Sequence, residues 1–210
     1  MTPRAALDRG LGELALVLPP GAPSKLMAYL ELLAKWNKTY NLTAIRDPLQ
    51  AVSHHLLDSL AVLRDLSGCA GTLADIGSGG GLPGIPIAIA EPARSVTLNE
   101  ASEKKGAFLR QAVIELGLSN VKVHVGRVED WRQTERFAVV ISRGFANLVD
   151  FLAGCRHLAA PLGVLAAMKG AYPRDELVQV PVDCDCREVR RLKVPLLDAE
   201  RHLVLCRVGS

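Results

Sequence analysis

Leucines recur at helical spacing in the first third of the chain. Between residues 26 and 33 they fall at intervals of four and three, with charged residues on the other face, which predicts an amphipathic helix. A second helix is predicted to begin at Asp47 and Pro48, an N-cap residue followed by proline, and to carry an apolar stripe to Leu63. We expect residues 1–66 to form a helical cap on the rest of the chain.

From residue 72 onward, short apolar runs alternate with longer helical stretches. This alternation is typical of βαβ units and a mostly parallel sheet. Two final runs, 189–195 and 202–208, have no helix between them and predict a hairpin at the sheet edge. The fold class is therefore predicted to be α/β, a Rossmann-like doubly wound sheet over residues 67–210 that forms one compact unit with its N-terminal helical extension. The expected strands are 72–76, 95–98, 121–125, 137–141 and 164–168, and the expected helices are 85–90, 103–116 and 148–158.

Composition narrows the class of protein. The 210 residues are 49% hydrophobic and carry 25 Lys and Arg against 22 Asp and Glu, so the chain can bury a core and is not disordered throughout. No segment has the roughly 20 apolar residues of a bilayer span, and residues 1–20 lack the pattern of a secretory leader. We expect a cytoplasmic protein without a membrane partner. An aromatic content of 4% gives no sign of a large interface, and we expect a monomer.

The five cysteines show no paired C-x-x-C spacing. We interpret them as reduced, small hydrophobic residues. Cys184 and Cys186 are close together, but two thiolates do not complete a tetrahedral site, so no metal is expected.

The most informative segment is the glycine-rich stretch 77–84, which follows a predicted strand. Gly77 and Gly79 let the backbone turn sharply and approach a ligand. Asp75 precedes them, and a fixed carboxylate disfavours the pyrophosphate of a dinucleotide. The same carboxylate favours the ammonium and sulfonium groups of S-adenosylmethionine. We expect that cofactor, with an NAD(P)-dependent oxidoreductase as the alternative and a purely structural turn as a further one.

Two later acidic positions fit the same cofactor. Glu100 ends the second predicted strand, 19 residues after Gly81, at the spacing expected for a ribose-binding acid. A helix N-terminal carboxylate is its alternative role. Glu129 lies in an acidic turn after the third strand, where a backbone N–H and a carboxylate could meet the edge of adenine; a solvated turn is the alternative.

Several motifs in a fixed order carry a resemblance over nearly the whole chain. The sequence resembles the bacterial 16S rRNA guanine-N7 methyltransferase family, also called glucose-inhibited division protein B. The motifs are Lys35-Trp36-Asn37, Asn41-Leu42-Thr43, His55-Leu56-Leu57-Asp58-Ser59-Leu60, Asp75 to Pro86, Ile141-Ser142-Arg143-Gly144-Phe145-Ala146, Met168-Lys169-Gly170 and Glu200-Arg201-His202-Leu203.

The resemblance implies a class I methyltransferase that transfers the methyl group of S-adenosylmethionine to N7 of a guanine in the decoding-region hairpin of 16S rRNA, either naked or in an assembling small subunit. The chain departs from the family in having Glu100 in place of the usual aspartate and Gly144 in place of the usual alanine. The cofactor-binding residues it implies are Gly77, Leu82, Glu100, Ala101, Ser102, Val128, Glu129 and Arg143, to which the loop chemistry adds Asp75 and Gly79.

Methylation at guanine N7 needs no general base, because N7 presents a free lone pair. No catalytic residue is therefore assigned, and catalysis is expected to rest on positioning. Arg143 is expected to hold the cofactor carboxylate or a target phosphate. Phe145 is either a stacking platform for the guanine or a core residue. His55 and Asp58, three apart, are expected to form a structural hydrogen bond.

Basic residues supply candidate RNA contacts through phosphate neutralisation. The C-terminal segment 187–207 has six Lys and Arg and three Asp and Glu (6 − 3 = +3). A small-molecule methyltransferase and a non-catalytic RNA-binding module are further alternatives, and a solvated surface is the alternative role of each basic residue. The RNA-binding residues that we predict are Lys35, Lys38, Arg46 and Arg201.

Overall fold

A seven-stranded sheet forms the centre of the molecule. The computed structural model describes residues 1–132, 134–145 and 147–208. The strands are β1 (Leu73–Ile76), β2 (Val96–Glu100), β3 (Val121–Val125), β4 (Phe137–Arg143), β5 (Ala159–Lys169), β6 (Cys184–Arg191) and β7 (His202–Val208). The helices are α1 (Pro3–Glu13), α2 (Ala22–Tyr40), α3 (Pro48–Ala51), α4 (Asp58–Leu60), α5 (Gly84–Ala90), α6 (Glu103–Glu115), α7 (Leu148–Cys155) and α8 (Arg174–Val178), with a π-helical turn at Val52–Leu57 and 3₁₀ turns at Val128–Asp130 and Arg156–Leu158.

The strand order is β3-β2-β1-β4-β5-β7-β6. Strands β1 to β5 are parallel, whereas β7 runs antiparallel to both of its neighbours, β5 and β6. The predicted doubly wound α/β sheet is confirmed. The chain order reverses between β1 and β4, and the carboxyl ends of strands at such a switch point form the usual ligand site of open α/β sheets.

The final hairpin is confirmed, but its first strand was placed too late. β6 starts at Cys184 and ends at Arg191, whereas the prediction placed it at 189–195. The sequence of β6 is polar, with charged residues such as Arg187 and Glu188, so it lacks the apolar pattern that predicts a strand. An edge strand exposes one side and needs little apolar character.

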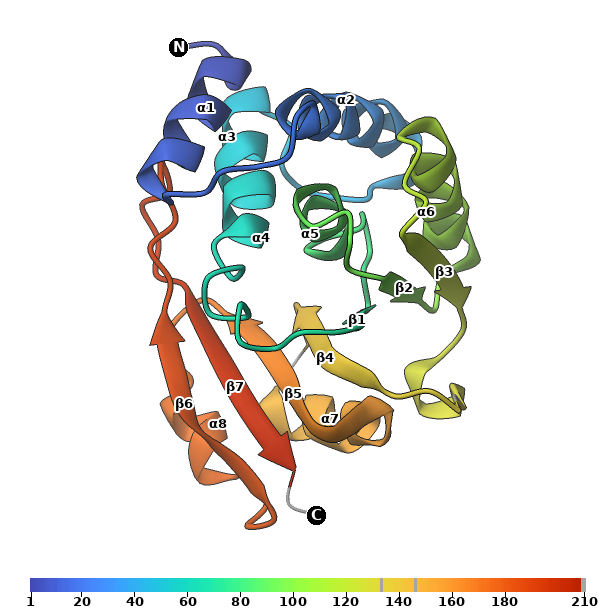
Figure 1. The fold of residues 1–210 in the computed structure, drawn as a ribbon, viewed down its shortest axis with the longest axis vertical. Helices are drawn as coiled ribbons and strands as arrows, with labels where there is room; N and C mark the ends of the chain where they lie inside the picture. Colours follow the sequence, from blue (N-terminus) through green and yellow to red (C-terminus); the bar gives the residue numbers. More distant parts are fainter. Residues whose placement is uncertain (133, 146, 209–210) are drawn as a thin grey trace.

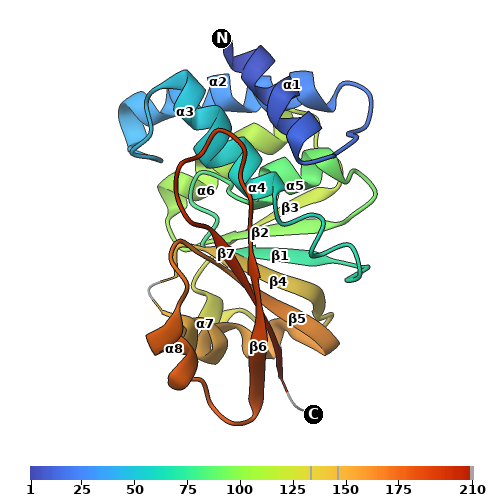
Figure 2. The ribbon, with the colours of Figure 1, turned by 90° about the vertical axis from the view of Figure 1, so that its left-hand side faces the viewer.

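Helices cover both faces of the sheet (Figures 1 and 2). α5 and α6 lie on one face with α1 to α4 stacked above them, and α7 and α8 lie on the other. The buried side chains accordingly form two clusters, one on each face, and the larger includes residues of the N-terminal helices together with α5 and α6. None of the described helices combines the length and hydropathy needed to cross a membrane.

Local sequence explains where several helices begin. Asp47 caps α3 by accepting the N–H of Gln50 at 2.8 Å, as its position before Pro48 predicts. The helix that follows contains the π-helical turn and ends at Leu60, three residues before the predicted limit. Asp58 directly follows the π-helical turn and is buried, with Arg143 at the end of β4 as a partner.

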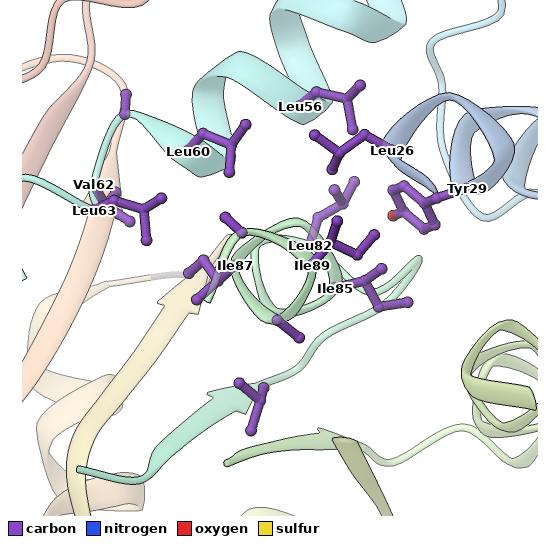
Figure 3. Packing of buried hydrophobic residues seen from close by; sticks show 14 of the residues in the cluster. Leu26, Tyr29, Leu56, Leu60, Val62, Leu63, Leu82, Ile85, Ile87 and Ile89 are labelled. Atoms are coloured by element: carbon purple, nitrogen blue, oxygen red, sulfur yellow. The ribbon is translucent and has the colours of Figure 1, made fainter. Parts of the chain in front are cut away.

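Helix α5 is buried on all sides. Every residue from Gly84 to Ala90 is buried, because the sheet lies on one side of the helix and α2 and α4 lie on the other. Figure 3 shows Leu26 and Tyr29 of α2 and Leu60 of α4 packed around Ile85 and Ile87. The N-terminal helices therefore complete the core above the sheet.

The prediction that all five cysteines are reduced is wrong. Cys186 and Cys206 form a disulfide between β6 and β7, and Cys69, Cys155 and Cys184 are free. The two bonded residues are 20 apart in sequence and become neighbours only because β7 pairs with β6 in antiparallel register. Spacing along the chain contains no signal for that pairing.

Candidate functional site

The carboxyl ends of β1 and β4 open into a cavity of about 690 Å³. Gly77 follows β1 and Arg143 ends β4, so the switch point brings together two segments 66 residues apart (143 − 77). The volume falls in the range of about 300–1,000 Å³ that is usual for small-molecule sites. The cavity is lined by Gly77, Glu129, Ser142, Arg143, Gly144, Phe145, Asp150, Ala153 and Gly154.

Glycine is required in the loop after β1 for conformational reasons. Gly77 and Gly79 have φ values of +67° and +56°, in the left-handed region that disfavours other residues. A Cβ at Gly77 would meet no atom within 4 Å, so the loop presents bare backbone to the cavity at this position. This arrangement fits the close approach of a ligand that the sequence predicted.

Asp75 does not face the cavity. Its side chain is fully buried, Oδ2 accepts the N–H of Gly84 at 2.9 Å, and Oδ1 has no partner among the described residues. Burial raises its pKa to about 7. The side chain points from β1 into the space beneath α5 and does not line the cavity, so any effect of Asp75 on a ligand would be electrostatic or through the loop. Asp75 holds the glycine loop against that helix.

Glu100 lies beside the loop as the spacing predicted. Its two carboxylate oxygens accept the N–H of Gly79 and the N–H of Ser102, each at 2.9 Å, and the residue is 7% exposed. The neighbouring Asn99 is committed elsewhere, since its amide donates to His124 Nδ1 and to the Gly126 carbonyl, both at 3.0 Å. Glu100 thus ties the glycine loop to the segment after β2.

The remaining predicted cofactor residues differ in exposure. The side chain of Leu82 is buried in the core under α2, so only its backbone could meet a ligand (Figure 3). Ala101 is exposed, and Ser102 caps α6 through a 3.5 Å contact from the N–H of Lys105. Val128 is buried and Glu129 is exposed in the predicted turn, and the latter residue lines the cavity.

Asp58 binds two arginines from distant segments. Its Oδ2 accepts from Arg143 Nη1 at 2.9 Å, and its Oδ1 accepts from Arg201 Nε at 3.0 Å. The carboxylate is 2% exposed and each arginine side chain 24%. The same Nη1 of Arg143 also donates to the His54 carbonyl at 2.9 Å. This cluster links the N-terminal helices, the end of β4 and the segment before β7.

The predicted His55–Asp58 hydrogen bond is wrong. His55 Nε2 instead bonds Thr43 Oγ1 at 2.9 Å, because Asp58 is occupied by the two arginines. Burial lowers the pKa of His55 to about 4. Sequence reasoning missed the role of Asp58, although the conspicuous 55–60 motif contains it.

A second cavity, of about 420 Å³, adjoins the first. Arg143 and Gly144 line both, so the two spaces meet at the end of β4. Gly144 has a φ of +104°, which only glycine adopts readily. The lining of the second cavity includes six further polar or charged residues: His54, His55, Asp58, Lys169, Arg201 and His202.

Phe145 is half-buried, with its ring centroid 5.4 Å from that of Phe151, and it lines the larger cavity. It thus has an exposed portion as well as a core contact. The neighbouring Ala146 of the same motif lies outside the described residues.

The predicted RNA-binding residues do not form one group. Lys35 and Lys38 are exposed on α2, and Arg46 is exposed before α3. Arg201 lies apart from them in the Asp58 cluster.

Three arginines of the basic C-terminal segment have acidic partners beside them. Arg187 pairs with Asp185 at 2.7 Å, and Arg190 and Arg207 pair with Glu188 at 2.7 and 3.3 Å. These pairings arise along and across the β6–β7 hairpin, which a count of charges cannot anticipate.

Comparison with known proteins is decisive for the family. A family model described as rRNA small subunit methyltransferase G (GidB) matches residues 22–204. The chain belongs to this family. A ribosomal RNA small subunit methyltransferase G from Aromatoleum aromaticum is 53% identical over 205 residues, covering 96% of this chain and 97% of the relative. Proteins of the same name from Laribacter hongkongensis and Neisseria meningitidis serogroup A are each 50% identical, covering 97% and 98% of this chain and 98% of each relative.

Solved structures support the fold of this GidB family member. The glycopeptide N-methyltransferase MtfA aligns with a TM-score of 0.62 at 13% identity, over 76% of this chain and 99% of that one. The DhpI–SAH complex aligns at 0.55 with 17% identity over 90% and 97%. TrmN from Thermus thermophilus aligns at 0.54 with 18% identity over 82% and 53%. At such identities the likeness shows the methyltransferase fold alone.

Proposed function

We propose that the protein transfers the methyl group of S-adenosylmethionine to N7 of a guanine in the decoding-region hairpin of 16S rRNA. Membership of the rRNA small subunit methyltransferase G family supports the reaction and the RNA class. Two cavities meet at Arg143 and Gly144, and this supports separate binding sites for the cofactor and for the target base. One cavity suits the cofactor and the other suits the base.

The residues of the larger cavity fit S-adenosylmethionine. Gly77 offers open backbone, Glu100 has an acceptor carboxylate fixed beside the loop, and Glu129 lies where the adenine edge would come. Bound there, the cofactor supplies an electrophilic methyl group on a sulfonium. We assign Gly77, Gly79, Glu100, Ala101, Ser102, Val128 and Glu129 to its binding, Leu82 through its backbone, and Asp75 as the residue that positions the loop.

The protein is proposed to act by orientation. Guanine N7 attacks with its own lone pair, so no side chain has to remove a proton, and holding the reacting atoms in line can lower the barrier by about 7–11 kcal/mol. His55 and Asp58 are then available for structural roles, which agrees with the hydrogen bond of His55 Nε2 to Thr43 and with the bonds of Asp58 to the two arginines.

Arg143 and Phe145 are the proposed contacts of the target nucleotide. Arg143 is fixed by Asp58 through Nη1, and its remaining N–H groups are available for the cofactor carboxylate or a phosphate at the junction. Phe145 lines the larger cavity next to Gly144, which is shared by both cavities, and its exposed portion can stack on a base that reaches this junction, worth about 1–3 kcal/mol. Arg201 is proposed to bind RNA with the part of its guanidinium that Asp58 does not occupy.

The substrate RNA is proposed to meet the protein in the cytoplasm, as naked rRNA or as an assembling particle. Lys35, Lys38 and Arg46 are exposed and are proposed to neutralise its phosphates. We also propose that the protein acts as a monomer, because an aromatic content of 4% gives no sign of a large interface.

Methyl transfer from labelled S-adenosylmethionine tests this proposal. Purified protein is incubated with naked 16S rRNA and with small subunits, the RNA is digested, and nucleosides are identified by mass spectrometry. We expect 7-methylguanosine at one position. Methylation of another atom, of a small metabolite only, or tight binding of NADH without S-adenosylmethionine would overturn it.

A matched pair of acids tests the cofactor assignment. Glu100→Ala should weaken S-adenosylmethionine binding by about 1–3 kcal/mol, since it leaves the N–H groups of Gly79 and Ser102 without their acceptor. Glu103→Ala removes an exposed acid three residues away and should leave the affinity near that of the wild type. Calorimetric titration of both variants distinguishes the two outcomes.

A further inference from the structure

A third cavity, of about 340 Å³, lies between α2 and α3. Its walls are mainly apolar, with Met27 and Leu30 from α2 and Pro48 and Ala51 from α3. None of the residues proposed to bind the cofactor lines it. The cavity is thus a separate space within the N-terminal helices.

More positively than negatively charged side chains line this cavity. Lys38 and Arg46 contribute two cations to its lining, and Glu31 contributes one carboxylate. All three residues are exposed. A ligand that combines an apolar body with an anionic group therefore matches the site better than an uncharged one.

The inner wall contains a polar atom without a partner. His55 is 5% exposed, its Nε2 is bonded to Thr43 Oγ1, and its Nδ1 has no hydrogen-bond partner among the described residues. Either tautomer of the ring leaves that nitrogen unsatisfied, and an unsatisfied buried polar group costs about 1–3 kcal/mol. Because this atom has no exposed surface, a ligand with a polar edge would relieve the cost only together with a rotation of the imidazole ring toward the cavity.

His55 also connects the cavity to the proposed substrate side. It lines both this apolar cavity and the polar cavity that contains Arg143 and Arg201. A chain of nucleotides whose target base lies at Arg143 would therefore have a neighbouring nucleotide within reach of the apolar cavity.

We propose that the cavity between α2 and α3 binds an unpaired nucleotide of the substrate RNA that flanks the target guanine. The base would lie against Met27, Leu30 and Ala51 with its polar edge toward His55, and a phosphate would lie at Lys38 and Arg46. The apolar walls suit the flat faces of a nucleobase, and the polar group at one side suits its hydrogen-bonding edge. Proteins recognise unpaired bases of RNA by contacts with these faces and edges. This inference rests on the proposed rRNA substrate.

Direct binding of a short RNA tests the inference without methyl transfer. The probe is a single-stranded pentanucleotide that contains 2-aminopurine, whose fluorescence changes when the base is buried. We expect saturable binding to the wild type and at least tenfold weaker binding to Ala51→Phe, which fills the cavity, and to Lys38→Glu. The control Lys122→Glu makes the same charge change at an exposed position on β3 and should stay within twofold of the wild type.

The outcomes separate this inference from the proposed function. Affinity for S-adenosylmethionine and the thermal midpoint of each variant check that it is folded. If Ala51→Phe binds the cofactor normally and the pentanucleotide as tightly as the wild type, the inference is wrong, even if the wild type methylates 16S rRNA. If an uncharged nucleoside competes as well as the pentanucleotide, the role of Lys38 and Arg46 is wrong. Failure of the wild type to methylate rRNA would count against the proposed function instead.

Discussion

Asp58 Oδ2 accepts a hydrogen bond from Arg143 Nη1 at 2.9 Å, across 85 residues of sequence. The bond joins the helix that follows the π-helical turn to the end of β4, where the two cavities meet. Because Asp58 also holds Arg201, one buried carboxylate fixes the two arginines that we propose to face the cofactor and the RNA.

Asp58→Asn should destabilise the protein by about 3 kcal/mol, since it leaves two partly buried arginines without their counter-charge. Urea unfolding followed by circular dichroism measures the change. Asp183→Asn, which removes the acid of an exposed pair with Arg156, is the matched control and should leave the midpoint near that of the wild type. Equal midpoints for both variants would contradict the structural role of Asp58.

Asp75 should make stability depend on pH. The pKa of Asp75 is about 7 in the folded protein, against an ordinary value of 3.8 that we take for the unfolded chain. Between these two pH values the folded state retains a proton that the unfolded state releases. Stability from this group is present below pH 3.8 and is lost as the pH rises through about 7, by up to about 1.4 kcal/mol per pH unit. Asp75→Asn removes this dependence, so the variant should gain stability relative to the wild type from pH 5 to pH 8 in denaturant titrations. A difference that stays constant over that range would contradict the prediction.

Gly84→Ala should displace the glycine loop. An added Cβ would collide with the Leu98 side chain and lie 2.7 Å from Asp75 Oδ2, so the close approach of α5 to β1 would be lost. We expect about 1–3 kcal/mol of destabilisation and at least tenfold weaker binding of S-adenosylmethionine, measured by calorimetry. Gly12→Ala is the control: its Cβ meets nothing within 4 Å inside α1, and it should stabilise the protein by about 0.5–1 kcal/mol. Similar effects of the two substitutions would be inconsistent with this packing.

Thiol titration in denaturant should distinguish the paired from the free cysteines. Protein purified without a reductant should give three reactive thiols, from Cys69, Cys155 and Cys184. The same protein should give five after reduction. A count of five before reduction would show that Cys186 and Cys206 are unpaired under those conditions.

The fold class could be predicted from the sequence, because the spacing of apolar residues depends on the local secondary structure. The apolar runs of β1, β2, β4 and β5 are largely buried in the sheet, whereas β3 is more exposed, and the alternation with helices leaves few topologies open. The glycine positions and Glu100 could also be placed, since strand ends and loop conformations depend on residues near in sequence.

Contacts between segments far apart in the chain could not be predicted from the sequence pattern. Asp75 and Asp58 each have a carboxylate whose direction depends on how an element packs. The sequence did not show that Asp75 lies under α5, and the partner predicted for Asp58, His55, was wrong. The β6 edge strand and its disulfide escaped detection for the same reason, because cross-strand partners are set by pairing and not by spacing.

The last strand of the chain is an inner strand of the sheet. β7 fills the gap between β5 and β6, and Arg201 directly precedes it. During synthesis β5 therefore remains an open edge until β7 leaves the ribosome, and a product truncated before residue 201 would lack both that strand and one of the two arginines on Asp58. The sheet and the Asp58 cluster are therefore complete only after β7 has been synthesised.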